Sequence, residues 1–493
     1  MFAALPDAFG ISLGYTNDPT TFKNRSTPAP STRSMACKAQ TSGRIYLHSG
    51  PRTELHEIIR QEYARHQDRA VPRNTLRQAV QGMLDTFAYQ NFDAAAGEYT
   101  NRCCRPPRET EMRPWRLVTE IGWTGGGVLA YPLVLCRDAL GADAEAPLAA
   151  AMSGEQLFDR IADAYNENSG LLNDLMAPNA AGSQVNGWWT GYGLVKDCHC
   201  AYTVGSAVHY LTKTMDYLHQ NGKPCPAKWM DAAQKVLHTV MDLQRADGAF
   251  GYTYSTQERK VLDWSGFAGC WFAPALVYLY RLTGEERCLH SAEKALDYYH
   301  TFVKDLNCYG TPMDTWKAVD EEGNLAFMRG SRLLYEQTGK AEFLQYMKDS
   351  AGYEFLWRYG YKTYPEHTPL NQGWSACGGA VTSVSNPHIH PMGVIIDTDL
   401  RYLARVTGDG YYASRAADSA AWMLQCLELY PAATGYGRYG ILSERWCPSD
   451  GLDVERFSDG RPFSSWFSHN LWASACVLEA ACELLLEIEH KKG

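Results

Sequence analysis

Three short turns of one type recur in the second half of the chain, and they constrain the fold more than any other feature. Each is a Thr-Gly pair between two amphipathic stretches, at Thr283-Gly284, Thr338-Gly339 and Thr407-Gly408. Glycine adopts the left-handed conformation that ends a helix, and nearby polar residues favour the start of the next one. The threonines lie 55 and 69 residues apart, so we expect repeated helical hairpins arranged as a closed ring or an open solenoid.

The length of the chain favours one large domain built from such hairpins. Six hairpins at this spacing would need roughly 360–420 residues, and the chain has 493. Helical periodicity begins near Thr53 and continues to about residue 489, with no convincing alternation of strands. Residues 1–50 are rich in Thr, Ser, Pro and Ala and lack this periodicity. We therefore expect an irregular N-terminal arm over 1–50 and a single all-α domain over 51–493.

Composition excludes several classes of partner. The net charge is −9 and no basic run stands out, so we expect no nucleic-acid partner. No apolar stretch is long enough to span a membrane. The 15 cysteines and the absence of a recognisable signal peptide favour reduced thiols and a cytoplasmic location, which an export signal missing from this sequence would overturn. The sequence leaves homo-oligomerisation open.

Glycine-rich aromatic loops separate the helical blocks, at 186–193, 248–254 and 435–440. Together with the Thr-Gly turns and the Gln-x-x-Asp-Gly stretch at 244–248, they resemble the (α/α)6 toroid of the six-hairpin glycosidase superfamily. That superfamily contains glycoside hydrolases, polysaccharide lyases and sugar epimerases. Within the hydrolases, the segment 383–393 is similar to enzymes that act on uronic-acid sugars, such as β-glucuronidases. The resemblance implies an exo-acting hydrolase that removes a terminal uronic acid from an oligosaccharide.

Four carboxylates are candidate acids, bases or nucleophiles, because glycoside hydrolysis uses two carboxyl groups beside the scissile bond. Glu120 precedes a glycine run, Asp263 precedes an apolar helix, Asp314 lies in a loop beside a tryptophan, and Glu444 lies in a loop rich in Gly and Tyr. Each also has a structural interpretation. Glu120 would be an ordinary helix-terminal residue, Asp263 an N-cap, Asp314 a turn residue and Glu444 half of an internal ion pair with Arg445.

His388 and His390 are the candidate anchors of a substrate carboxylate. Alternate positions in an extended segment would point both side chains the same way. Structural histidines bonded to neighbouring loops are the alternative. Arg438 and Arg445 are candidate clamps, because a guanidinium group can hold a carboxylate through two parallel hydrogen bonds.

Aromatic rings that could stack on sugar faces complete the expected site. We expect this role for residues in or beside the glycine-rich loops, namely Trp123, Trp188, Trp189, Tyr252, Trp316 and Trp374. The Cys198-His199-Cys200 triplet lacks the spacing and the second pair of a zinc site, so we interpret its cysteines as buried thiols and expect neither metal nor cofactor.

Three rival functions remain open at this point. A lyase on the same scaffold would abstract a proton with Tyr252, Tyr254 or His388, and an epimerase would exchange a proton between two histidines. A non-catalytic helical scaffold is disfavoured by the aromatic loops. Glu321 and Glu322 are interpreted as first-turn helix residues, favoured there by the helix dipole.

Overall fold

The computed structural model describes most of the chain from residue 50 onward. The described residues are 2–5, 8–11, 50–51, 54–66, 69–103, 113–116, 119–122, 126–178, 184–187, 198–312, 317–362, 374–384, 386–429, 440, 442–444, 446 and 468–490. Their side chains are described except at 2–5, 8–11, 102–103, 113–116, 119–120, 175–178, 184–187, 386–387, 468 and 490. In this part of the chain no helix is both long and apolar enough to cross a membrane.

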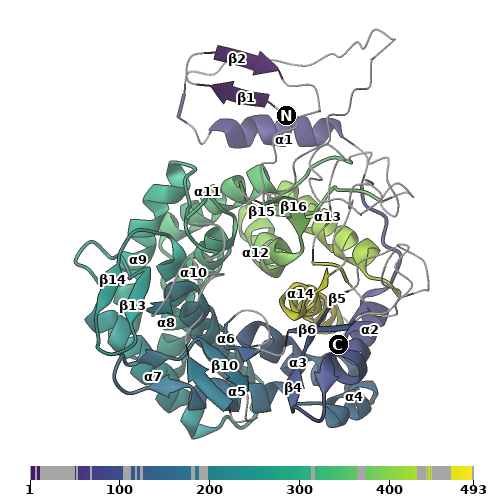
Figure 1. Ribbon diagram of the computed structural model, residues 1–493. Helices are drawn as coiled ribbons and strands as arrows, with labels where there is room; N and C mark the ends of the chain where they lie inside the picture. The colour runs from purple at the N-terminus through teal and green to yellow at the C-terminus, as the bar shows by residue number, and fades with distance from the viewer. Residues whose placement is uncertain are drawn as a thin grey trace.

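Helical hairpins form a closed ring in which inner and outer helices alternate along the chain (Figure 1). The inner helices are α3 (Gly127–Leu140), α6 (Ala201–Gln220), α8 (Phe272–Thr283), α10 (Glu322–Thr338), α12 (Asp397–Thr407) and α14 (Leu471–His490). The outer helices are α2 (Leu76–Thr86), α5 (Gly154–Asp163), α7 (Ala227–Asp242), α9 (Glu286–Lys304), α11 (Ala341–Trp357) and α13 (Gly410–Cys426). Because α14 packs against α3, the ring closes, and the predicted (α/α)6 toroid is confirmed.

Two further helices stand outside this alternation. The short α4 (Glu145–Ala150) precedes α5, and α1 (Leu55–Arg65) packs against α11 on the outside of the ring (Figure 1). The strands β1 (Phe2–Leu5) and β2 (Ala8–Ile11) pair as an antiparallel hairpin near the N-terminus.

The inner helices are buried on nearly every side. In α6, 17 residues are buried, including small residues such as Gly205 and Ala207 that allow its neighbours to approach closely. A helix that is apolar around most of its circumference belongs in a core, and here the core is the layer between the inner and outer helices. The largest buried side chains in this layer include Trp229, Trp271 and Phe158.

The Thr-Gly turns end three inner helices as the sequence predicted. Gly284, Gly339 and Gly408 have φ angles of 74°, 66° and 69°. In the first turn the Thr283 hydroxyl donates to the Leu279 carbonyl at 2.8 Å and accepts from the Glu285 N–H at 3.2 Å. The other two turns repeat this pair of hydrogen bonds. Threonine therefore joins the end of one helix to the start of the next, while glycine supplies the left-handed residue.

The two ends of the ring differ because of these turns. From α6 onward the connections from an inner to an outer helix are short, whereas the one from α3 to α5 contains α4; these connections form what we call the short-turn face. Connections from an outer to an inner helix are long, and they form the long-loop face, which carries small sheets that the helical periodicity did not predict. These include β12 (Cys198–Cys200) with β13 (Thr253–Ser255) and β14 (Val261–Asp263), and β15 (Ala380–Ser383) with β16 (Asn386–His390).

A glycine replacement tests the role of the turns. A Cβ at Gly339 would meet no atom within 4 Å, so Gly339→Ala should cost only the strain of a left-handed alanine, about 1–2 kcal/mol of unfolding free energy. Gly410 is equally open but helical, so Gly410→Ala should lose no stability. Urea unfolding midpoints of the two variants measure the difference. An equal loss in both would contradict this account of the turns.

Candidate active site

Residues from three inner helices meet inside the ring at the long-loop face. The Tyr202 hydroxyl, in the first turn of α6, donates to Glu322 Oε2 at 2.6 Å, and Glu322 begins α10. Met392 Sδ, in the 3-10 turn η6 (Met392–Ile396) before α12, lies 3.6 Å from the same hydroxyl. Because α8 separates α6 from α10 in the ring, this contact crosses the ring interior. Burial and the Glu322 charge raise the pKa of Tyr202, which keeps the phenol protonated as a donor.

The predicted histidine pair lies at the same end of the ring. His388 and His390 belong to β16, so the predicted extended segment is confirmed, and both are buried. His390 Nδ1 lies 3.0 Å from the His388 carbonyl oxygen. The His390 ring stacks on Trp472, in the first turn of α14, with centroids 6.0 Å apart. Met392, which contacts the Tyr202 hydroxyl, follows His390 by two residues. The histidine pair is therefore close in sequence to a residue that touches the Tyr202–Glu322 contact.

The backbone two residues after Glu444 pairs with β16. The Ile389 N–H donates to the Trp446 carbonyl at 2.8 Å, and the Trp446 N–H donates to the Ile389 carbonyl at 2.9 Å. The segment 442–446 therefore runs next to β16, and half-buried Glu444 lies two residues from the pairing point.

The backbone of Glu120 also reaches this end of the ring. Glu120 ends β7 (Thr119–Glu120), and Gly122 follows it against the first turn of α6. A Cβ at Gly122 would lie 1.9 Å from the Thr203 carbonyl oxygen, so only glycine fits there. The Ser206 hydroxyl donates to the Gly122 carbonyl at 2.8 Å. Thr203 follows Tyr202, so the end of β7 lies next to the turn of α6 that carries Tyr202. The Glu120 side chain itself lies outside the described residues.

A second group of carboxylates is buried in the ring wall. Arg358 donates to Glu354 at 2.7 Å, to Asp397 at 2.8 Å and to the Gly393 carbonyl at 2.7 Å. Glu321 is fully buried, and its carboxyl hydrogen-bonds to the Glu354 side chain when it is protonated. Burial and the Glu354 charge raise the pKa of Glu321 well above its usual value. Glu321 is therefore a neutral carboxyl group held one residue from Glu322.

Asp263 lies apart from this site, and its carboxylate is already bound by other groups of the protein. It ends β14 and caps no helix, because α8 begins at Phe272, so the N-cap interpretation was wrong. Its carboxylate accepts from Lys317 Nζ at 2.6 Å and from the Ser265 N–H at 2.8 Å. Partial burial opposes its ionisation, but these donors hold the pKa of Asp263 below its usual value. An ionised, paired carboxylate suits a structural role better than proton donation.

Two predicted stacking residues are buried instead. Tyr252 packs between Lys317, whose Nζ lies 4.4 Å from the ring centroid, and Gly266, where a Cβ would lie 2.5 Å from the ring. Trp374 is buried next to Ser375, which hydrogen-bonds to Gln425 of α13. In the described structure neither ring presents an open face to a sugar.

The remaining candidates lie outside the described residues. They are Asp314, Trp123, Trp188, Trp189, Trp316, Arg438 and Arg445. Their roles stay predictions from the sequence.

The Cys198-His199-Cys200 triplet forms a buried structural strand. His199 Nδ1 lies 2.9 Å from Asp174, and its Nε2 lies 2.9 Å from the Ser169 hydroxyl. Both cysteines are buried and neither forms a disulfide, so the interpretation as buried thiols is confirmed. Over the residues whose positions are described, no group of three or more His, Cys, Asp or Glu is arranged to hold a metal ion.

Sequence reasoning missed Tyr202 and undervalued Glu322. Glu322 does occupy the first turn of α10, as predicted from the helix dipole. It is nevertheless buried, whereas a first-turn glutamate that only serves the dipole is normally solvated. The run of three acidic residues at 320–322, directly before an apolar helix, was the available signal.

Solved structures of several sugar-processing enzymes share this ring. A sugar epimerase from a ruminal bacterium superposes with a TM-score of 0.54 at 10% identity, over 88% of this chain and 99% of that one. A family 76 glycoside hydrolase (mannosidase) from Bacteroides thetaiotaomicron gives 0.51 at 14%, over 84% and 99%. An unsaturated glucuronyl hydrolase from a Bacillus species gives 0.51 at 14%, over 83% and 97%.

The chain has the fold of the six-hairpin glycosidase superfamily. The resemblance predicted from the sequence is thus confirmed at the level of the fold. No protein-family model and no curated protein matches the sequence.

The neutral state of Glu321 makes a testable contribution to stability. An unfolded glutamate ionises above about pH 4.3, whereas folded Glu321 stays protonated, so stability should fall as the pH rises from that value toward the raised folded pKa of Glu321. Glu321→Gln removes this loss, which is at most about 1.4 kcal/mol per pH unit. We expect the variant to gain stability relative to wild type between about pH 5 and pH 8, measured as urea midpoints.

The control for this experiment is Glu342→Gln, at an exposed position in the first turn of α11. Its pH profile should run parallel to wild type. A parallel profile for Glu321→Gln as well would show that Glu321 is ionised in the folded protein.

Proposed function

We propose that the protein is a glycoside hydrolase that works inside the ring at the long-loop face and removes a terminal sugar from an oligosaccharide. The observation that carries the proposal is the Glu322 carboxylate, buried inside the ring and held by the Tyr202 hydroxyl. The shared fold of a mannosidase and a glucuronyl hydrolase supports it.

Glu322 would supply one of the two carboxyl groups that glycoside hydrolysis requires. Glu120 and Glu444 are the candidates for the other, because β7 and the segment 442–446 bring their backbones to the same end of the ring. The Tyr202 hydrogen bond stabilises the ionised form and fixes the orientation of Glu322.

A uronic-acid sugar is the substrate class we favour. His388 and His390 lie on β16 at the long-loop face, the end of the ring where Glu322 also lies, and a protonated imidazole would bind a sugar carboxylate. Arg438 and Arg445 would add bidentate hydrogen bonds, as the sequence predicts. A glucuronyl hydrolase of the same fold is consistent with this substrate class.

A sugar epimerase or isomerase is the second candidate. Two buried histidines lie at the same end of the ring as Glu322 and Tyr202, and groups of these types can remove and return a proton without cutting a bond. The fold is also that of a sugar epimerase. The two candidates differ in their products, because hydrolysis adds water and epimerisation leaves the mass unchanged.

The lyase with a tyrosine base is disfavoured. Tyr252 and Tyr254 are both buried, and burial raises the pKa of each phenol. A phenol acting as a base must ionise, which needs the opposite shift.

Mass spectrometry of the products tests the reaction type. We expect a panel of uronic-acid and neutral oligosaccharides to include one that is cleaved with gain of water. An unchanged mass with deuterium uptake from solvent would establish the epimerase instead. No change in any sugar, by mass or by deuterium, would contradict both candidates.

Glu322→Gln should lower kcat by a factor of about 10² or more, because it removes ionisation at the proposed catalytic carboxyl. The thermal unfolding transition should stay cooperative. Glu336→Gln is the control, since Glu336 lies on the same helix near the short-turn face, paired with Arg332. Near wild-type turnover in Glu322→Gln would exclude Glu322 from the chemistry.

A further inference from the structure

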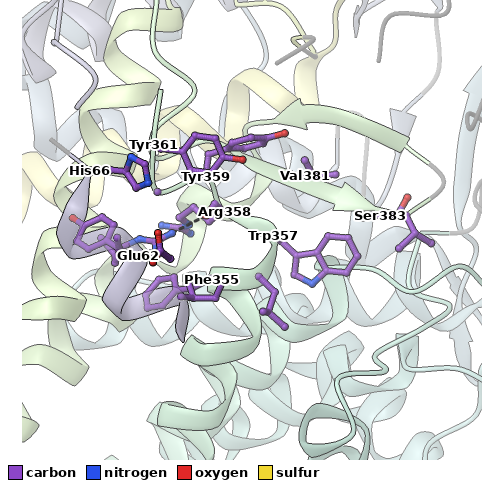
Figure 2. A pocket seen from close by; sticks show the side chains of 15 residues that line it. Glu62, His66, Phe355, Trp357, Arg358, Tyr359, Tyr361, Val381 and Ser383 are labelled. Atoms are coloured by element: carbon purple, nitrogen blue, oxygen red, sulfur yellow. Dashed lines mark hydrogen bonds between the residues drawn. The ribbon is translucent and has the colours of Figure 1, made fainter. Parts of the chain in front are cut away.

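A separate cavity of about 620 Å³ lies outside the ring, between α1 and the end of α11 (Figure 2). Helix α1 forms one wall, residues 355–361 form the floor, and β15 forms the far side. This volume lies within the range of pockets that bind small molecules, about 300–1,000 Å³.

Aromatic rings dominate the cavity. Trp357, Tyr359, Tyr361 and His66 all line it, as Figure 2 shows. Tyr361 is 45% exposed and packs its edge against Tyr359, with centroids 5.4 Å apart, and against His66 at 5.6 Å. A large aromatic ring that stays exposed beside a cavity is a surface available for stacking.

Two buried arginines lie in the floor. Arg358 is held by Glu354 and Asp397. Arg415 donates to the Arg358 carbonyl at 2.7 Å and lies between the rings of Tyr63 and Phe355. Arg415 Nε has no hydrogen-bond partner in the described structure. The cavity therefore offers ring faces and groups that can hydrogen-bond, which suits a ligand with apolar faces and hydroxyl edges.

Further polar atoms of the cavity lining lack a hydrogen-bond partner in the described structure. The Ser383 hydroxyl is fully buried and has no hydrogen bond within the described structure. A buried hydroxyl without a partner is costly, and a hydroxyl group of a ligand would satisfy it.

The cavity is also connected to the proposed active site. Ser383 ends β15, and β15 pairs with β16, which carries His388 and His390. The Ser383 backbone also bridges to Asp320, two residues before Glu322. One short hairpin thus links the cavity wall to the groups at the long-loop face.

We propose that this cavity is a carbohydrate subsite, which binds pyranose units of the oligosaccharide by stacking on Tyr361 and Trp357 and by hydrogen bonding to Ser383. This inference rests on the proposed function. It adds that the enzyme discriminates among substrates by chain length.

Tyr361→Ala tests the subsite, because the exposed ring can be removed with little effect on folding. With a hexasaccharide substrate KM should rise about tenfold at unchanged kcat, the loss expected for one stacked ring. With a short aryl monoglycoside the kinetics should match wild type. Tyr361→Phe should restore the long-substrate KM, and Tyr89→Ala, at another exposed tyrosine, should leave it unchanged.

A binding experiment separates this proposal from the proposed function. Calorimetry with chondroitin hexasaccharide and cellohexaose compares Glu322→Gln with the double variant that adds Tyr361→Ala. Weaker hexasaccharide binding in the double variant supports the subsite even if no sugar is turned over. Equal turnover kinetics of wild type and Tyr361→Ala, on both the hexasaccharide and the aryl monoglycoside, would leave the proposed function standing and overturn the subsite proposal. Failure of both hexasaccharides to bind would overturn it as well.

Discussion

The hydrogen-bonded threonine turn at the short-turn face is the constraint on which the rest of the structure depends. By joining the Leu279 carbonyl to the Glu285 N–H, Thr283 reverses the chain between two helices with almost no loop. Three consecutive hairpins share this device. Because these turns are so short, the longer connections, which vary in length, lie on the opposite face. That asymmetry places the small sheets, the histidine pair and Glu322 together at one end of the ring.

The buried charged side chains described next each pair with a group of opposite charge. Lys213 of α6 is buried and pairs with Glu479 and Glu483 of α14, and Arg329 of α10 pairs with Asp399 of α12. Such pairs tie different inner helices together, and removing one member would leave an uncompensated buried charge. Glu321 is the contrasting case, since its neighbour Glu354 is another carboxyl group, and burial together with the Glu354 charge favours the neutral form of Glu321. Neutral and ionised carboxyl groups side by side are the arrangement that acid–base chemistry requires.

Sequence patterns predicted best those features that depend on interactions between residues close together in the chain. The left-handed glycines, the α6 and α10 helices and the extended histidine segment depend on neighbours a few residues away, so the chain alone predicted them. Trp374 and Tyr252 failed as stacking residues because exposure depends on which distant segments cover a ring. Tyr252 is covered by Lys317 and Gly266, and neither contact follows from the loop in which Tyr252 lies.

By itself, the sequence determined the helical hairpins, the left-handed turns that close them, and the pool of carboxylates and histidines available for chemistry. The tertiary structure alone decided which of these meet. Tyr202 and Glu322 are 120 residues apart and come into contact only because the ring closes on itself. Asp263 was excluded by an ion pair with a residue 54 positions away. Closure is a long-range property, since the packing of α14 on α3 fixes the geometry of every inner helix, and no local pattern encodes it.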